Sequence, residues 1–94
     1  MPAVARVGDK EATHCSPPRR AGHFRTVFAN GIPMSGVGHN NTAHLRPCGL
    51  RCCTHTAPLR GGSRSVFAEG IRIGRVGDPT CTRVIQGSPN VFSN

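Results

Sequence analysis

The stretch "VFANGIPMSGVG", residues 27–38, returns 39 residues later as "VFAEGIRIGRVG", residues 66–77. In each copy an Asn-Gly or Glu-Gly pair lies between two short apolar segments. Asn-Gly is a strong signal for a tight β-hairpin, because both turn residues must adopt positive φ angles, and Glu-Gly is a weaker form of the same signal. The repeat therefore predicts one short hairpin in each copy.

The two chain ends read as the halves of a third copy. "VFSN" at residues 91–94 starts this copy, and "PAVARVGD" at residues 2–9 continues it in register with residues 71–78. We expect the termini to lie near each other, with residues 2–7 pairing beside Val91 and Phe92. No stretch carries the 3.6-residue apolar period of a helix. The expected fold class is a small β domain, with three short β-hairpins in a pseudo-threefold, circularly permuted arrangement and irregular loops between them.

The Val-Gly-Asp steps at Asp9 and Asp78 are typical of strand ends. Glycine permits the turn at such a step, and the Asp side chain can accept a hydrogen bond from its own backbone neighbourhood. In the middle copy His39 stands where the other two copies have Asp. We expect that turn to be built differently.

The composition predicts a small domain that needs stabilisation beyond its hydrophobic core. Only 36% of the 94 residues are hydrophobic, whereas Gly and Pro contribute 12 and 8 residues. Chains of this length form small cores and are commonly reinforced by disulfides, a metal or a partner. We expect a single domain, residues 1–94, without a fused effector.

Five cysteines are an odd number, and the N-terminus lacks the apolar segment of a signal peptide. We therefore expect synthesis in the cytoplasm, where thiols stay reduced, and no complete disulfide framework. The roles of Cys15, Cys48, Cys52 and Cys53 stay open. Cys52 and Cys53 read either as buried small hydrophobic residues or as oxidisable thiols.

Twelve basic residues against four acidic ones give a formal charge of +8. Such a charge favours nucleic acid, an anionic membrane or an acidic protein as a partner. The Arg residues are scattered, with no recognition helix and no interleaved aromatic side chains, which disfavours nucleic acid. A small zinc-dependent, basic nucleic-acid-binding module remains the alternative, and steep salt dependence of DNA binding would support it.

An enzyme is the other class to consider. Glu11 and Glu69 are the only glutamates, and neither neighbours a candidate metal ligand in the sequence. Zinc deaminases need a His-x-Glu motif, which is missing here, and nothing selects a nucleophile among five cysteines. We expect a protein without enzymatic activity.

Counting forward from the Val-Gly steps identifies candidate metal ligands. His14 follows Gly8 by six residues, His44 follows Gly38 by six, and Cys81 follows Gly77 by four. If the copies are related by a threefold axis, these three side chains converge at one end of it. His55 could complete a tetrahedral shell of three imidazoles and one thiolate, a set that Zn²⁺ prefers. The competing interpretations are surface or loop histidines without metal, or a metal site built from the cysteines, Cys15, Cys48, Cys52, Cys53 and Cys81.

In its repeat and in these four candidate ligands, the chain resembles the PAAR-repeat proteins. These are small zinc-binding cones that cap the spike of type VI secretion systems and related contractile phage tails. The resemblance extends from "AVARVGD" through "VFANGIP", "CCTHTAPL" and "VFAEGIRIGRVGDPTC" to "GSPNVF". The namesake Pro-Ala-Ala-Arg motif is matched only loosely, by residues 2–6. The family's three-His, one-Cys shell carries over to His14, His44, His55 and Cys81, which implies one structural Zn²⁺ near the tip.

The resemblance also implies a mechanical function. A free monomer would cap a trimeric β-helical spike, one cone per trimer, and help to pierce the target cell envelope with transient contact to the membrane. Localisation would be at the tip of a phage tail or secretion spike, after synthesis in the cytoplasm. The residues expected to contact the spike are Val27, Phe28, Ile32, Val66, Phe67, Ile71, Val91 and Phe92.

Overall fold

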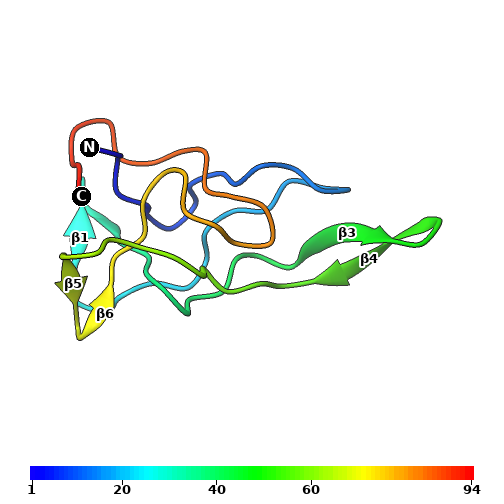
Figure 1. Ribbon diagram of the computed structural model, residues 1–94, viewed down its shortest axis with the longest axis horizontal. Helices are drawn as coiled ribbons and strands as arrows, with labels where there is room; N and C mark the ends of the chain where they lie inside the picture. The colour runs from blue at the N-terminus through cyan, green and yellow to red at the C-terminus, as the bar shows by residue number, and fades with distance from the viewer.

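Two short hairpins form where the repeat predicts them. In the computed structural model, which describes residues 1–94, β1 (Phe28–Ala29) pairs with β2 (Ile32–Pro33). β5 (Phe67–Ala68) pairs in the same antiparallel register with β6 (Ile71–Arg72). Both hairpins lie at one end of the molecule (Figure 1).

The turns of these hairpins have the backbone conformation that the dipeptides favour. Asn30 and Gly31 have φ angles of 56° and 74°, and Glu69 and Gly70 have 50° and 78°. Positive φ at both central residues characterises the turn whose twist matches that of the flanking strands. The prediction is confirmed at both sites, including the less favourable Glu-Gly pair.

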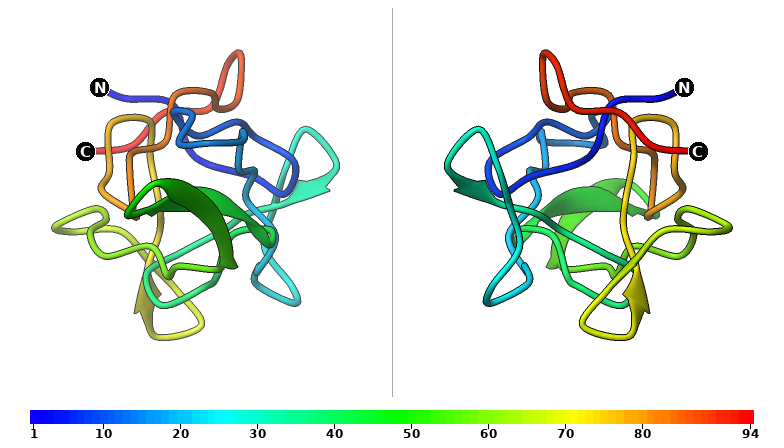
Figure 2. Two further views of the ribbon diagram at one scale, coloured as in Figure 1. Left: turned by 90° about the vertical axis from the view of Figure 1, so that its right-hand side faces the viewer. Right: turned by 90° about the vertical axis from the view of Figure 1, so that its left-hand side faces the viewer.

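The third predicted hairpin is present only as a minimal pairing of the chain ends. Ala3 and Phe92 form an antiparallel bridge, and Val4 N–H donates to the carbonyl of Val91 at 3.0 Å. The termini lie beside each other at the end of the molecule that carries β1, β5 and β6 (Figures 1 and 2). The expected proximity of the termini is therefore found, although the paired segment is shorter than predicted.

A further hairpin occupies a region where the sequence predicted an irregular loop. β3 (His44–Cys48) pairs with β4 (Arg51–His55) through a turn at Gly49, whose φ is 71°. It projects from the end opposite the termini (Figure 1). Most of its residues are exposed, so no apolar alternation marked the hairpin in the sequence. Pro47 lies within β3, and a proline in a run of residues argues against a strand. All secondary structure is β, and no helix is available to span a membrane.

The expectation of reduced cysteines is wrong in this structure. Cys15 is bonded to Cys52 and Cys48 to Cys53, with Cα atoms 6.0 Å and 5.9 Å apart, whereas Cys81 is free. The hairpin places Cys52 and Cys53 on the surface, so they are not buried small hydrophobic residues. The Cys15–Cys52 bond closes a 37-residue separation, which corresponds to about 4 kcal/mol in the chain-entropy description.

Three segments of the repeat meet in a closed ring of backbone hydrogen bonds. Ala5 N–H donates to Gly74 O at 2.9 Å, Gly74 N–H to Ser35 O at 2.8 Å, and Ser35 N–H to Ala5 O at 3.0 Å. Each residue stands three positions before a Val-Gly glycine. A Cβ at position 74 would lie 2.4 Å from a Leu59 methyl carbon and 3.0 Å from Ser35 O, so the meeting point requires small residues.

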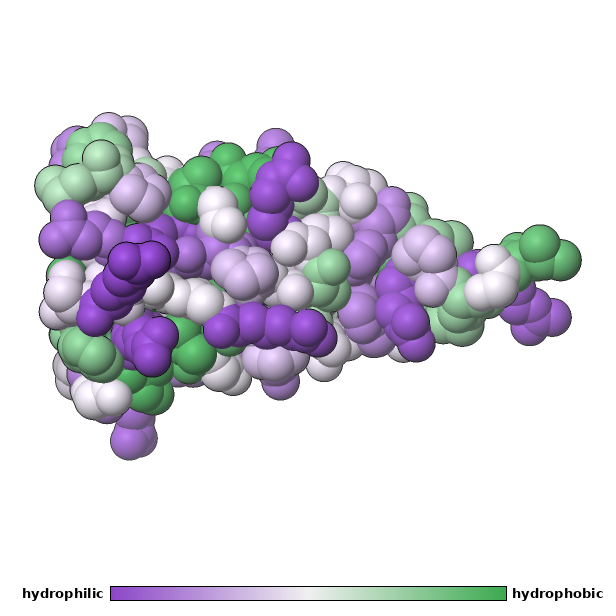
Figure 3. All heavy atoms as spheres, viewed as in Figure 1, coloured by the Kyte–Doolittle hydropathy of each residue, from purple (hydrophilic) through white to green (hydrophobic).

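The molecule tapers from the end with the termini towards the β3–β4 hairpin (Figure 3), with extents of 40 × 23 × 23 Å. Two small apolar clusters lie inside it. The first comprises Val4, Phe24, Ala29, Met34, Ala68 and Ile73, and the second comprises Ala5, Leu59 and Val84. Cores of this size bury little apolar surface, which leaves polar contacts and covalent links to contribute much of the stability.

The Val-Gly-Asp turns behave as predicted. Asp9 accepts a hydrogen bond from Arg6 N–H at 2.8 Å, and Asp78 accepts one from Arg75 N–H at 2.7 Å. The same carboxylates form ion pairs with the two guanidinium groups at 3.1 Å and 2.9 Å. Each Asp thus closes its turn and neutralises a neighbouring Arg.

In the middle copy His39 closes the equivalent turn with a different acceptor. Its Nδ1 accepts the Gly36 N–H at 2.9 Å, so the turn keeps its shape without a carboxylate. Desolvation by burial, followed by the charges of Arg20 and His23, lowers the pKa of His39 from its ordinary 6.5. As expected, the middle turn differs from the other two, because its acceptor is an imidazole nitrogen and not a carboxylate. The hydrogen-bond pattern is the same in all three turns.

We predict that His39→Asp makes the protein less sensitive to acid. In the unfolded chain His39 takes up a proton near its ordinary pKa, whereas the folded protein resists protonation, so stability falls as the pH drops below about 6.5. Comparing the melting temperatures of wild type and variant at about pH 7.5 and pH 5.5 tests this difference. The two proteins differ only at position 39, so an equal acid-induced loss in both would contradict the role given to His39.

Candidate metal centre

Four side chains converge near the base of the β3–β4 hairpin. His14 lies on the N-terminal loop, His44 begins β3, His55 ends β4, and Cys81 follows the last Val-Gly turn. One donor atom from each lies within 4.8 Å of the others, so the group can hold a metal ion. These are the four residues that the sequence singled out, and the fold brings all of them together.

The hairpin register places two of the ligands side by side. His44 and His55 are directly paired residues, and their Nε2 atoms are 2.9 Å apart. The His14 ring stacks on His44 at a centroid distance of 5.3 Å and an interplanar angle of 6°. Cys81 Sγ lies 3.3 Å from His44 Nε2, which makes His44 the centre of the cluster.

Hydrogen bonding orients His44 for metal binding. Its Nδ1 lies 2.8 Å from the carbonyl of Thr42, and a carbonyl can only accept, so Nδ1 carries the proton. Nε2 is then left with a lone pair that faces the other three donors. A metal-binding imidazole commonly has its second nitrogen fixed in this way.

The other two imidazoles also present nitrogen atoms that suit a metal. His14 Nε2 is buried without any hydrogen-bond partner, a costly state for a polar atom unless something binds it. Desolvation, followed by the charges of His44, Arg46 and His14, lowers the pKa of His55 from 6.5. A lowered pKa keeps this ring neutral at neutral pH, and only the neutral ring can donate its lone pair.

The spacing of the donors fits a single ion. Metal–nitrogen bonds of about 2.0–2.1 Å in a tetrahedral shell separate neighbouring nitrogen atoms by about 3.3 Å. The contacts of 2.9 Å and 3.3 Å around His44 Nε2 are close to that edge length. The residues present therefore fit a four-coordinate ion held entirely by protein donors.

A buried polar network supports the cluster, and sequence reasoning missed it. Glu11 and Arg20 form an ion pair at 2.9 Å with both side chains fully buried. Glu11 also accepts hydrogen bonds from Thr80 Oγ1 at 2.8 Å and Asn41 Nδ2 at 3.0 Å. Asn41 Nδ2 lies 3.6 Å from Cys81 Sγ, so the network reaches a candidate metal ligand directly.

The network joins loops that carry different ligands. Asn41 Oδ1 accepts the Ala57 N–H at 2.8 Å, two residues after His55, and Thr80 directly precedes Cys81. Glu11 is adjacent to no ligand in the sequence, and only the tertiary structure shows its role. No local sequence signal marked Glu11, because its partners Asn41 and Thr80 lie 30 and 69 residues away.

The cluster is accessible from the protein surface. An open pocket is lined by His14, His55 and Cys81, together with Arg46 and Arg60. The pocket therefore offers a metal ion or a chelator an approach to the cluster without unfolding of the domain.

The residues expected to contact a partner lie far from this cluster. Phe28, Phe67 and Phe92 are exposed by 54%, 57% and 51%. Apolar side chains are visible at the broad end of the molecule in Figure 3. Val66, Ile71 and Val91 are also exposed, whereas Val27 and Ile32 are half-buried.

Comparison with known proteins leaves the chain without an assigned family. No model of a protein family matches it, and no curated protein matches its sequence. Function is therefore inferred from the repeat, the metal cluster and the exposed apolar end.

We predict that Glu11→Gln destabilises the domain strongly. The substitution leaves the buried Arg20 guanidinium without its counter-ion, a change that typically costs about 3–5 kcal/mol. Chemical denaturation should therefore show a lower free energy of unfolding, with a smaller amount of bound metal. Lys10→Gln is the matched control, because the Lys10 side chain is exposed, and it should change stability by less than about 0.5 kcal/mol. Equal stability of the two variants would contradict a structural role for the ion pair.

Proposed function

We propose that this protein is a zinc-stabilised, non-enzymatic spike tip of the PAAR-repeat type. It caps the trimeric β-helical spike of a contractile injection machine, a type VI secretion system or a phage tail, and helps to pierce the target envelope. The observation that carries the proposal is the exposure of three Phe residues at equivalent repeat positions, at the end opposite the metal cluster.

A pseudo-threefold cone accounts for the repeated contacts. Residues at equivalent positions, Ala5, Ser35 and Gly74, donate to one another in a cycle. Two Val-Gly turns are closed by Asp and the third by a His nitrogen in the same role. Such a pattern is what three copies of one unit around a common axis would produce.

The broad end suits a partner that also has threefold symmetry. Phe28, Phe67 and Phe92 offer one exposed aromatic ring per copy, and Val66, Ile71 and Val91 extend the apolar surface. Large exposed apolar residues gathered on a small protein commonly mark an interaction site. The blunt end of a trimeric β-helix presents three equivalent strand ends. One cone per trimer would place one copy of the repeat on each spike chain and cover the exposed strand edges.

Zinc is the ion that the donor set favours. Three imidazoles and one thiolate match its preferred ligands, and four protein donors leave no open position for a reactive water molecule. Glu11 is fully occupied by Arg20, Asn41 and Thr80, so it is not free to move protons. Both features support a structural metal and a protein without catalytic activity.

The narrow end is suited to mechanical contact. The β3–β4 hairpin projects there, held by two disulfide bonds and by the metal cluster at its base. Arg46 and Arg51 on this hairpin have no acidic neighbour within β3 or β4, so an anionic membrane surface would attract them. In this proposal the chain is made in the cytoplasm and delivered through the target envelope at the spike tip.

We predict one Zn²⁺ per chain in the wild type and substantially less in Cys81→Ala. Removal of the thiolate leaves three imidazoles and an open coordination position, which lowers both metal affinity and thermal stability. Elemental mass spectrometry of the purified proteins measures the metal content. His23→Ala is the control, because His23 lies outside the cluster. Absence of metal in the wild type, or full retention in Cys81→Ala, would refute the assignment.

We also predict that Phe67→Asp weakens capping of a trimeric β-helical spike, because it places a charge in an apolar interface. Binding should weaken by more than about tenfold, as is usual for a buried aromatic contact. Light scattering coupled to size-exclusion chromatography should show one wild-type chain per spike trimer. Leu50→Asp, a change in an exposed residue at the opposite end, should bind like the wild type. Unchanged binding of Phe67→Asp would exclude this end as the docking face.

A further inference from the structure

The loop that carries His14 extends away from the main body. Glu11 N–H donates to Pro18 O at 3.1 Å and closes the base of the loop, and residues 12–17 lie beyond this closure. Its hydrogen bonds to β3 are few. Cys15 N–H and Ser16 N–H donate to Leu45 O at 3.1 Å and 3.3 Å, and Leu45 N–H donates to Ser16 Oγ at 2.8 Å.

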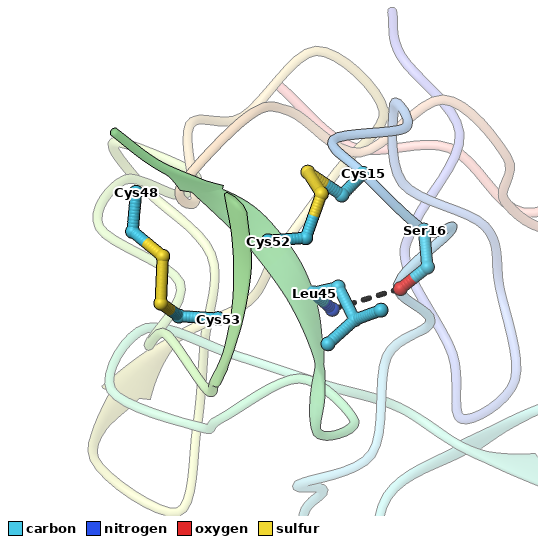
Figure 4. The surroundings of a disulfide bond; sticks show 6 residues. All are labelled: Cys15, Ser16, Leu45, Cys48, Cys52 and Cys53. Carbon is cyan, nitrogen blue, oxygen red and sulfur yellow. Dashed lines mark hydrogen bonds between the residues drawn. A yellow bond between two sulfur atoms is a disulfide. The ribbon is translucent and has the colours of Figure 1, made fainter. Parts of the chain in front are cut away.

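The Cys15–Cys52 disulfide is the covalent link between this loop and the hairpin (Figure 4). Cys15 is adjacent to His14, and Cys52 precedes His55 by three residues. The bond therefore joins two chain segments that each supply a donor to the cluster. Without it, the loop is held against β3 by three hydrogen bonds that join Cys15 and Ser16 to Leu45 and by the stacking of His14 on His44. At the base of the loop, Ala12 is also hydrogen-bonded to Thr82 and Arg83.

The second disulfide is placed differently. Cys48 and Cys53 both belong to the β3–β4 hairpin, whose strands are already paired along five residues. Cys48 pairs with Arg51 next to the turn and Cys53 pairs with Arg46 in the middle of the hairpin, whereas His44 and His55 pair at its base. This disulfide connects no additional ligand-bearing segment to the hairpin, and so it serves as an internal comparison for the first.

We propose that the Cys15–Cys52 disulfide is an oxidative clamp on the metal centre: its formation slows the release of the bound ion, and its reduction allows the ion to exchange. The inference rests on the proposed metal-binding function and adds redox control to that site. It does not depend on the spike partner.

Formation of the Cys15–Cys52 disulfide needs only a disulfide oxidant such as oxidised glutathione. The thiolate of Cys52 attacks one sulfur of the oxidant, forms a mixed disulfide and releases one glutathione thiolate. The thiolate of Cys15 then displaces the second glutathione. Two protein thiols lose two protons and two electrons in total, and the oxidant is reduced to two thiols. Both protein residues are exposed and accessible to this exchange.

The physical basis of the clamp is the high local concentration of His14. A metal ion leaves a four-ligand site by successive loss of ligands, and a donor whose segment makes few other contacts can depart first. A tether keeps such a donor near the ion, so it rebinds before the remaining ligands dissociate. In a reducing compartment the ion would exchange, whereas in an oxidising environment it would be retained.

Metal release tests the clamp directly. The full chain is loaded with Zn²⁺, oxidised with oxidised glutathione and mixed with an excess of a colorimetric zinc chelator. The double variant Cys15→Ser/Cys52→Ser should release Zn²⁺ on the order of tenfold faster than the wild type, a typical effect of losing a group that positions a metal ligand. The control Cys48→Ser/Cys53→Ser should release it at the wild-type rate.

Reduction of the unmodified chain provides a measurement that does not depend on the variants folding. A phosphine reductant should accelerate release from the wild type, and reoxidation should restore slow release. In the metal-free protein, the amides of Cys15 and Ser16 should exchange hydrogen faster after reduction.

The outcomes separate the two proposals. If the wild type binds Zn²⁺ but releases it at one rate in both redox states, the clamp is refuted and the metal site stands. Equal acceleration in both double variants, or no Cys15–Cys52 bond in peptide mapping of the oxidised chain, would refute the clamp as well. If the wild type binds no Zn²⁺ in either redox state, the metal site and the clamp both fail.

Discussion

The ring of backbone hydrogen bonds among Ala5, Ser35 and Gly74 is the constraint on which the rest of the structure depends. It joins segments 30 and 39 residues apart in the sequence, and each segment leads directly into a Val-Gly turn. Three backbone segments this close together tolerate only small side chains. At Gly74, for example, a Cβ would collide with Leu59 and contact Ser35 O. The turns then direct the following loops towards the narrow end.

A small apolar core makes polar interactions more important here than in larger domains. The buried Glu11–Arg20 pair stabilises the domain only because further donors satisfy the carboxylate, since an unpaired charge inside a protein is costly. The same carboxylate binds Thr80 and Asn41, which contact or adjoin Cys81. Stability of the fold and geometry of the metal cluster therefore share one network.

The two ends of the molecule present opposite chemistry. The broad end exposes aromatic side chains, which suits association, whereas the narrow end combines the His/Cys cluster with a disulfide-linked hairpin. The separation of an exposed apolar end from the His/Cys cluster and its disulfide-linked hairpin supports the proposed spike tip. With this separation, the proposed redox control of the metal centre at the narrow end would leave the exposed apolar end unchanged.

The sequence by itself determined the two tight hairpins, the small all-β class and the identity of the four clustered donors. Each of these depends on local signals, because a turn dipeptide restricts its own φ angles and a repeat keeps equivalent residues at equivalent positions. Only the tertiary structure decided the β3–β4 hairpin, the pairing of four cysteines and the burial of Glu11 against Arg20. The Cys15–Cys52 bond joins residues 37 apart in the sequence, and Glu11 is enclosed by Asn41 and Thr80 from other parts of the chain. The β3–β4 hairpin and the Cys48–Cys53 bond are local in the sequence but carry no local signal. An exposed hairpin leaves no apolar pattern, and neither a disulfide partner nor a buried counter-ion can be read from neighbouring residues.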